Sequence, residues 1–408
     1  MEHWRKNLYV LWGTQFLAML GMNLVVPFLP FFIRSLGITD PNELARWSGL
    51  VFAGPFVLSF IATPLWGTLG DRYGRRTMVI RAIFGLALSQ LLMGFAQDVV
   101  QLLMFRVLQG AISGFIAATL ALVSTTTPKE RMGYAMGLMQ SASAGGMVFG
   151  PFFGGVLADL FGYRPVFFIT AAFCTIAGFI VIFLVTEPAP ATEAKRTYTV
   201  RDNLRLMMTD RRLRLIAICL VVGQVSVLMV EPIFALFIEG FSTDSKYIST
   251  IAGGIFSIAG LFMVVSAPWW GKRNDRKGQR KNLALAFVIV GLCYAGHLLV
   301  QDLYQLGALR AFLGFARGGI LPALYALTGL YAPADRQGGM MAIASSMSVL
   351  GNLIGPTLGG FIAGHYGISA AFIANSILLV AMGTAVWRYL DATPAALTTA
   401  PEPRTANE

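Results

Sequence analysis

Four charged side chains stand inside stretches that are otherwise apolar: Arg106, Glu231, Arg310 and Arg317. An ionised group at the centre of a lipid bilayer costs at least about 2.5 kcal/mol, so such residues usually serve a function. Glu231 lies in "VGQVSVLMVEPIFALFI", directly before a proline. A carboxylate held away from water can take up a proton or pair with a cation. Glu231 is therefore a candidate for proton coupling, and an ion pair near the outer face of a membrane is the alternative.

Two of the arginines follow one another along a single apolar stretch, "RAFLGFARGGILPAL", which contains Arg310 and Arg317. If both face Glu231, the space between them could hold anionic or zwitterionic compounds as well as cations. We therefore predict substrate contacts at both arginines. The alternative is a structural ion pair, or a side chain that reaches out to the interface.

Uncharged polar residues inside apolar stretches supply further candidates. Gln15, Asn23 and Gln224 are predicted polar contacts in a substrate cavity. His297 could titrate, although a hydrogen-bonded structural histidine is the favoured interpretation.

The composition shows which kind of element must position these residues. The chain has 408 residues, of which 56% are hydrophobic and only 12% are charged. Apolar stretches of about 20 residues recur along it, and each can cross a hydrocarbon layer ~30 Å thick. The three cysteines are far apart and show no metal-ligand spacing or disulfide framework. The sequence thus predicts an all-α integral membrane protein that binds no metal.

We expect twelve transmembrane helices in two bundles of six. The N-terminal bundle covers residues 1–186, a cytoplasmic linker 187–213, the C-terminal bundle 214–390 and a disordered tail 391–408. The first apolar stretch lacks a small-residue cleavage site, which favours a retained helix over a signal peptide. The predicted helices are at about 8–33, 47–69, 77–97, 100–124, 132–158, 163–186, 214–238, 248–270, 282–300, 303–330, 338–363 and 367–390.

The net charge of +11 comes from basic residues in short loops between apolar stretches. This placement is typical of cytoplasmic loops and argues against nucleic-acid binding. If both termini are cytoplasmic, most of the 31 Lys and Arg residues lie on that side. We therefore expect a multi-pass membrane protein with both ends inside.

The chain contains an internal repeat. "GTLGDRYGRR" (Gly67–Arg76) recurs 204 residues later as "GKRNDRKGQR" (Gly271–Arg280), and "RVLQG" recurs at the same offset as "RAFLG". "GMVFGPFFGG" (Gly146–Gly155) recurs as "GNLIGPTLGG" (Gly351–Gly360). Two bundles in the same orientation are expected to enclose a substrate cavity near the membrane midplane.

These motifs resemble those of the major facilitator superfamily, and the resemblance covers nearly the whole chain. Gly67–Arg76 is similar to the signature loop between helices 2 and 3, and Leu102–Gly110 to the helix 4 motif. Gly146–Gly155 matches the helix 5 motif of drug/proton antiporters, and the C-terminal half is similar to bacterial multidrug exporters of the MdtG-like kind. The resemblance implies proton-coupled efflux of drugs or other small amphipathic molecules by alternating access. It also implies a monomer in the lipid bilayer that binds a small molecule and protons and needs no cofactor.

The resemblance also assigns roles to individual residues. It implicates Arg106 in proton coupling or substrate binding. Many antiporters carry an acid in helix 1 where this chain has Asn23, so the coupling carboxylate must lie elsewhere, and Glu231 is the acid well inside a span. The repeated loops would act as a cytoplasmic gate, although a loop that only sets topology is the alternative. The gate residues are Gly67, Asp71, Arg72, Gly74, Arg75 and Arg76, with Asp275 and Arg276 in the second copy.

The physical properties of the motif residues fit these roles. Gly74 can adopt a positive φ in a sharp turn. Gly146, Gly150 and Gly154 share one helix face, where another helix can approach closely. Pro151 removes a backbone hydrogen bond and bends the helix. Together with Gly155 these residues would form a hinge and a leak-tight seal, and ordinary small-residue packing is the alternative.

Other function classes find less support in the sequence. The chain has no Gly-x-x-x-x-Gly-Lys phosphate loop and no Gly-x-Ser-x-Gly or His-Glu-x-x-His arrangement, so we do not expect an enzyme. Three alternatives to a drug exporter stay open. They are an exporter of one endogenous metabolite such as a siderophore or lipid-like compound, a proton-coupled importer, and a membrane receptor that does not transport.

Overall fold

The computed structural model describes the chain except for residues 1–2, 113, 188–197, 242–244, 334 and 391–408. The tail predicted to be disordered therefore lies outside the described residues. All regular structure in the described part is helical. The N-terminal half contains α1 (His3–Leu24), α2 (Leu29–Ser35), α3 (Pro41–Tyr73), α4 (Arg75–Phe95), α5 (Val99–Ile112), α6 (Phe115–Thr126), η1 (Lys129–Arg131), α7 (Met132–Phe161) and α8 (Tyr163–Leu184).

The C-terminal half repeats this order after one extra helix. It contains α9 (Val200–Thr209), α10 (Arg211–Glu239), η2 (Ser245–Tyr247), α11 (Ile248–Lys277), α12 (Gln279–Gly296), η3 (His297–Leu299), α13 (Leu303–Arg317), α14 (Ile320–Tyr331), α15 (Gln337–Tyr366) and α16 (Ile368–Tyr389). In the described part, eleven helical segments can cross a membrane, or twelve when the bent pair α1–α2 counts as one. The predicted twelve-helix fold is confirmed.

Three of the predicted spans are interrupted at glycine or proline. The axis bends by 50° between α1 and α2, and Pro27, which has no amide hydrogen to donate, lies in this break. Gly114 takes a φ of 111° between α5 and α6, a conformation that favours glycine. In the second half, Gly318 and Gly319 separate α13 from α14. The apolar pattern predicted each span but did not show where its helix is interrupted.

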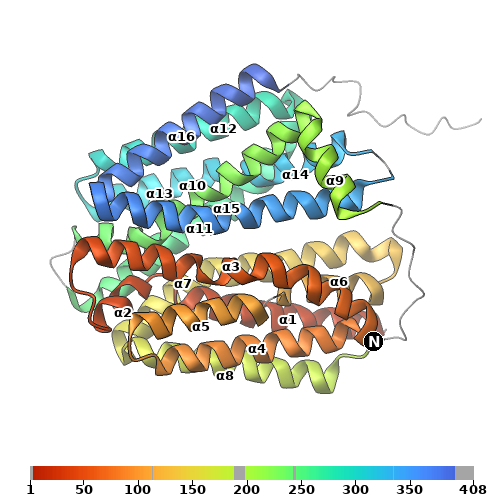
Figure 1. The fold of residues 1–408 in the computed structure, drawn as a ribbon, viewed down its shortest axis with the longest axis horizontal. Coiled ribbons are helices and arrows are strands. Elements are labelled where there is room, and N and C mark those ends of the chain that lie inside the picture. The colour runs from red at the N-terminus through yellow and green to blue at the C-terminus, as the bar shows by residue number, and fades with distance from the viewer. Residues whose placement is uncertain (1–2, 113, 188–197, 242–244, 334, 391–408) are drawn as a thin grey trace, which may run out of the picture.

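The two halves form separate bundles that lie side by side (Figure 1). Within the first bundle α1 packs on α7 and α8, and α4 packs on α8. Within the second, α10 packs on α15 and α12 packs on α16. The bundles meet mainly through two helix pairs, α3 with α15 and α7 with α11. These four helices are therefore the ones that must move past one another if the bundles tilt.

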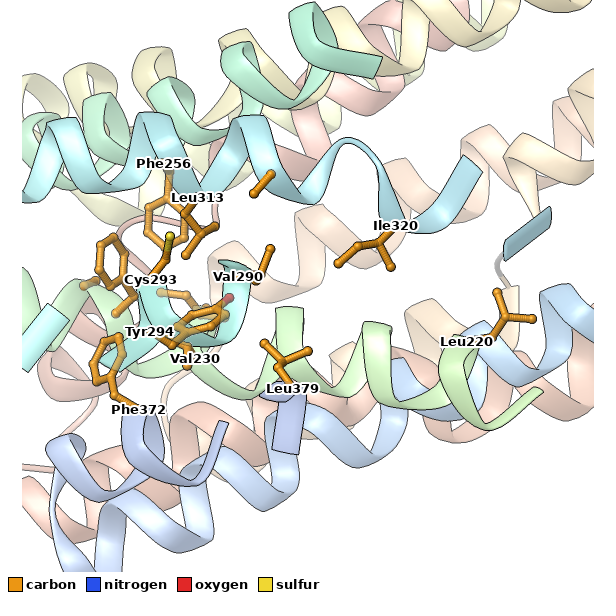
Figure 2. Close-up of a cluster of buried hydrophobic side chains, with 14 of the residues drawn as sticks. Leu220, Val230, Phe256, Val290, Cys293, Tyr294, Leu313, Ile320, Phe372 and Leu379 are labelled. Atoms are coloured by element: carbon orange, nitrogen blue, oxygen red, sulfur yellow. The ribbon is translucent and has the colours of Figure 1, made fainter. Parts of the chain in front are cut away.

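A large cluster of buried apolar side chains extends through both bundles, and Figure 2 shows part of it in the C-terminal bundle. Tyr294, Phe372 and Val230 come together there from α12, α16 and α10. The rings of Tyr294 and Phe372 have their centroids 6.3 Å apart. This packing fixes the helices that carry the intramembrane charges.

The predicted linker contains a helix that the sequence did not reveal. Thr199 and Asp202 form a capping box at the start of α9, and the hydrogen bond from the Thr199 hydroxyl lowers the pKa of the Asp202 carboxyl. Asn203 and Met207 are buried against the second bundle. Tyr198 holds the segment in place because its hydroxyl donates to Asp335 over 2.7 Å. The sequence predicted a polar linker over 187–213, and residues 200–209 of this segment form α9.

Candidate functional site

Glu231 and two of the predicted arginines come together within the C-terminal bundle. Glu231 is half-buried on α10, next to Pro232 inside the same helix. It interacts electrostatically with Arg317 and, to a lesser extent, with Arg310, both on α13. The helices α10 and α13, which are far apart in sequence, thus bring one acid and two bases to one place. Their roles in transport stay predictions.

Aromatic side chains surround this charged group. The guanidinium carbon of Arg310 lies 3.2 Å from the centroid of the Phe234 ring, which is one turn after Glu231 on α10. The ring of Tyr294 is buried nearby, and its hydroxyl interacts with Ser226. Tyr294 and Phe234 were not singled out from the sequence, because aromatic residues also face lipid and core.

His297 lies at the edge of the same aromatic cluster. Its Nδ1 is 2.7 Å from the carbonyl oxygen of Cys293, so Nδ1 must carry the proton. The ring stacks on Phe372 at a centroid distance of 4.9 Å, and only 1% of the residue is exposed. Its Nε2 is buried without a hydrogen-bond partner in the described part of the chain, and the structural role that the sequence favours stays a prediction.

The N-terminal bundle contributes Arg106. It is 9% exposed on α5, and its Nη1 donates to Gln109 Oε1 over 3.3 Å. Gln109 belongs to the same repeated motif, but the spacing of the motif did not identify it as a hydrogen-bond partner of Arg106. Arg106 is therefore a second buried cation, in the half that does not contain Glu231.

The three uncharged candidates lie at contacts between helices. Gln15 is fully buried, and its Nε2 donates to Ser143 Oγ over 2.7 Å, which joins α1 to α7. Asn23 is half-buried and donates to the carbonyl of Met19 in its own helix. Gln224 is half-buried on α10 beside Gly351 of α15. Contact with a substrate stays a prediction for all three.

The helix 5 motif packs against two different helices. A Cβ added at Gly146, Gly150 or Gly154 would collide with α1, where it would meet main-chain atoms of Leu20, Asn23 and Leu24. The close helix approach predicted for this face is thus present. Gly155 faces the other way, against the backbone of Ser249 and Thr250 in the second bundle. Pro151 lies within α7, and its carbonyl contacts Gly253 of α11.

The same arrangement recurs in the second half of the chain. Gly351, Gly355 and Gly359 of α15 pack on the backbone of α10. Gly360, which corresponds to Gly155, packs on Gly49 of α3 in the first bundle. Glycines that leave no room for a side chain thus lie on both sides of the contacts between the bundles, Gly49 and Gly155 in the first bundle and Gly253 and Gly360 in the second.

The first gate loop makes a sharp turn, as the sequence predicted. Gly74 has a φ of 92° and joins α3 to α4. The amides of Arg75 and Arg76 donate to the two carboxylate oxygens of Glu187, over 2.9 and 2.8 Å. Their guanidinium groups donate to main-chain carbonyls of Ala121 and Ile182. The carboxylate is thus held at a helix N-terminus by main-chain amides.

The other gate residues do not share the contacts of Arg75 and Arg76, or they lie outside the described part. Arg72 and Arg276 are exposed. The surroundings of Gly67 and the side chains of Asp71 and Asp275 lie outside the described part. In the second loop Gly278 has a φ of 82°, and Arg280 donates to the Trp387 carbonyl while lying over its ring.

Glu187 was read from the sequence only as the first residue of the linker, because its role depends on where α8 ends in space. Replacing it with Gln is expected to destabilise the protein by about 0.5–2 kcal/mol, the range for a lost helix cap. The measurement is thermal unfolding of the purified protein in detergent. Glu130→Gln is the control, since Glu130 is an exposed acid in η1. Equal unfolding temperatures for both variants would contradict the capping role.

The polar contacts between the bundles, within the described residues, all lie toward the end of the molecule that holds α2 and η2. Asp159 at the end of α7 accepts hydrogen bonds from the amides of Ser249 and Thr250, over 3.2 and 2.7 Å, at the start of α11. Arg34 and Glu239 form a two-pronged ion pair at 2.6 and 2.8 Å. A carboxylate at a helix N-terminus is favoured by its partial positive charge.

The equivalent contact in the other helix pair uses the opposite charge. Arg46 on α3 donates to the carbonyl of Gly364 near the end of α15, over 3.2 Å. Arg46 and Thr250 correspond in the repeat, at the offset of 204 residues. A cation at a helix C-terminus and an anion at a helix N-terminus both follow the helix dipole. Sequence reasoning missed Arg34 and Arg46 because only the docked bundles give them partners.

The described part contains no group of three or more His, Cys, Asp or Glu side chains that could hold a metal ion. The structure thus contains a polar cluster inside an apolar bundle, and its two bundles are joined at one end. A proton and a small molecule can both bind at such a cluster, and the joint can break and re-form.

Comparison with known proteins agrees with these features. The family model described as "Major Facilitator Superfamily" matches residues 11–303 and 249–407. The chain is 35% identical over 378 residues to "Multidrug resistance protein MdtG" of Enterobacter lignolyticus, which covers 93% of this chain and 90% of that protein. It is 36% identical over 376 residues to the protein of the same name from Proteus mirabilis, covering 90% and 92%. A crystal structure of a bacterial homolog of the human lysosomal transporter Spinster, inward-facing and occupied, superposes with a TM-score of 0.78 at 15% identity over 96% of each chain.

Proposed function

Because this chain belongs to the major facilitator superfamily, and is a membrane transporter rather than an enzyme, we propose that it exports drugs or other small amphipathic molecules across the bacterial inner membrane in exchange for protons. The proteins named MdtG that it resembles along most of its length support this substrate class. The observation that carries the proposal is the half-buried Glu231 beside Arg317 and Arg310. A single acid inside a bundle can exchange a proton with each side in turn.

With both termini in the cytoplasm, the end of the molecule that holds Asp159, Arg34 and Glu239 faces outward. The bundles are then joined on the outside, and the protein is in an inward-facing conformation. In this state cargo reaches Glu231 from the cytoplasm. The proton gradient supplies the energy, and no cofactor takes part.

The size of the outer contacts fits a reversible joint. A carboxylate at a helix N-terminus contributes about 0.3–1 kcal/mol, and an exposed ion pair contributes about 0.2–1 kcal/mol. The Arg34–Glu239 pair is in the second class, because each side chain is 39% exposed. Together these contacts amount to a few kcal/mol at most. A shift of one pKa unit at a coupled acid corresponds to about 1.4 kcal/mol, so protonation can tip such a balance.

The proposed cycle assigns a task to each group. Cargo binds from the cytoplasm while Glu231 is ionised and paired with Arg317. The outer contacts then break, the two gate loops close the cytoplasmic side, and cargo leaves. A proton from outside binds Glu231 and weakens its attraction to Arg317, which favours the return, and Glu231 releases this proton to the cytoplasm before the next cargo molecule binds. Arg106, in the opposite bundle, contributes to the electrostatics of this step.

Inverted membrane vesicles test the direction of transport. Energised inverted vesicles are expected to accumulate a lipophilic fluorescent dye and to dissipate their pH gradient when the dye is added. Vesicles without the protein provide the baseline. A proton-coupled importer would instead expel the dye from these vesicles, and a receptor would leave both signals at the baseline. Either result would refute the proposed exporter.

A further inference from the structure

Arg310 is a buried cation whose hydrogen bonds are not satisfied. Only 3% of the residue is exposed, and its Nε and Nη2 atoms have no hydrogen-bond partner in the described part of the chain. A buried charge without partners is costly, and a protein retains one mainly where something binds it. Arg310 therefore differs from Gln15 or Arg164, whose amide or guanidinium donates to a neighbouring oxygen.

The nearby acid does not neutralise Arg310 by itself. Arg317 is the stronger electrostatic partner of Glu231, and Arg310 is the weaker one. Arg310 also lies near Tyr294, an uncharged side chain that cannot neutralise it. One carboxylate thus faces two guanidinium groups, so one positive charge has no compensating negative charge. Arg106 adds a further cation in the opposite bundle, so the charges inside the spans are predominantly positive.

The surroundings of Arg310 leave one way to bind it. Phe234 covers a face of the guanidinium at 3.2 Å, so a ligand must approach the edge, where the N–H groups point. A planar edge of parallel donors matches two oxygens of a carboxylate or a related oxyanion. Glu231 and Arg317 are half-buried, so the group opens onto accessible space on their side. Aromatic residues beside it can receive the apolar part of the same molecule.

We propose that Arg310 anchors the acidic group of the cargo, so that the preferred substrates are amphipathic molecules with one carboxylate or similar oxyanion. This inference rests on the proposed transport function and specifies its substrate class. A cation would meet Arg310 and Arg317 with like charge, whereas an anion supplies the charge that the cluster lacks. The inside-negative membrane potential also favours the outward movement of an anion.

Equilibrium binding to the purified full-length protein tests the proposal. The probes are three fluorescent molecules with the same dansyl group and alkyl chain: 11-(dansylamino)undecanoate, its neutral amide and the corresponding trimethylammonium compound. Wild-type protein is expected to bind the carboxylate at least about tenfold more tightly than the amide or the cation, as a charge-assisted bidentate contact would give.

Arg310→Gln is expected to bring the three affinities to within about twofold and to leave the affinity for the amide unchanged. Arg310→Lys should restore part of the preference, because it keeps the charge but loses the planar edge. Arg164→Gln, in the other bundle, is the matched control and should keep the full preference.

Two results would overturn the proposal: equal binding of the three probes by the wild type, or a carboxylate preference that survives in Arg310→Gln. Equal binding of the three probes by the wild type would refute the proposal even if Arg310→Gln does not fold. Neither result bears on whether the protein exports its cargo, which the vesicle experiment decides separately. Failure of dye accumulation in vesicles, conversely, would remove the transport function and leave the measured anion preference intact.

Discussion

Glu231→Gln is expected to abolish proton-driven export while the protein still inserts and binds cargo. The amide has nearly the same size as the acid but cannot exchange a proton, so the inward-facing and outward-facing states lose their linkage to pH. We expect the rate of dye accumulation in inverted vesicles to fall by at least about tenfold, equivalent to about 1.4 kcal/mol of lost coupling. The change in bound protons on adding substrate to the purified protein should disappear with it.

Two further variants separate loss of coupling from loss of structure. Glu231→Asp keeps the acid on a shorter side chain and should retain part of the transport. Glu239→Gln removes an acid from the same helix, but at the ion pair with Arg34, and should leave this change in bound protons in place. An unaltered change in bound protons in Glu231→Gln would exclude Glu231 from the coupling step.

Gly155→Leu is expected to hold the transporter open on the side where the bundles now meet. A Cβ at this position would collide with the main chain of Ser249 and Thr250, and the colliding atoms belong to backbone that cannot rotate away. Each bundle should still fold, because Gly155 packs across the interface and not within its own bundle. Transport should fall to the level of vesicles without the protein.

The open state can be detected by labelling. Ser249→Cys places a thiol at a fully buried position of this joint, and the three native cysteines are all buried. A membrane-impermeant maleimide added to intact cells should label this thiol much faster when Ser249→Cys is combined with Gly155→Leu than in the Ser249→Cys single variant. Gly137→Leu is the matched control, because a Cβ there meets nothing within 4 Å. Slow labelling in both backgrounds would show that the joint closes in spite of the added side chain.

A comparison with Gly154→Leu sharpens this prediction. Gly154 is the neighbouring residue but packs on Leu24 within its own bundle. Overpacking a tight interior contact typically costs about 1–3 kcal/mol, so this variant should lower thermal stability. Adjacent glycines are thus expected to give two different defects, one in folding and one in conformation.

Long apolar stretches and glycine spacing allowed much of this fold to be predicted from the sequence. The predicted spans at 132–158 and 163–186 correspond to α7 (Met132–Phe161) and α8 (Tyr163–Leu184), because apolar length and a glycine turn define both ends. The internal repeat likewise predicted two bundles. Gly74 was predicted to take a positive φ, and it does, because a turn that sharp between two helices requires it.

The features that were missed depend on contacts between distant segments. Helix α9 is short and polar on its exposed side, so its apolar residues do not stand out until Met207 meets the second bundle. Glu187 has no local signal, since its partners Arg75 and Arg76 are brought to it by the packing of α4 on α8. Phe234 beside Arg310 was missed for the same reason: an aromatic residue in a span is ordinary until its neighbour is a buried cation.

Part of the contact between the bundles consists of main-chain atoms: Gly155 against Ser249 and Gly360 against Gly49. Such a contact does not depend on which side chains line the rest of the chamber. Residues around the cargo can therefore be exchanged in the course of selection without disturbing the mechanical parts. A population exposed to a new toxic compound could adapt this protein through changes in the wall of the binding region, while the moving machinery stays the same.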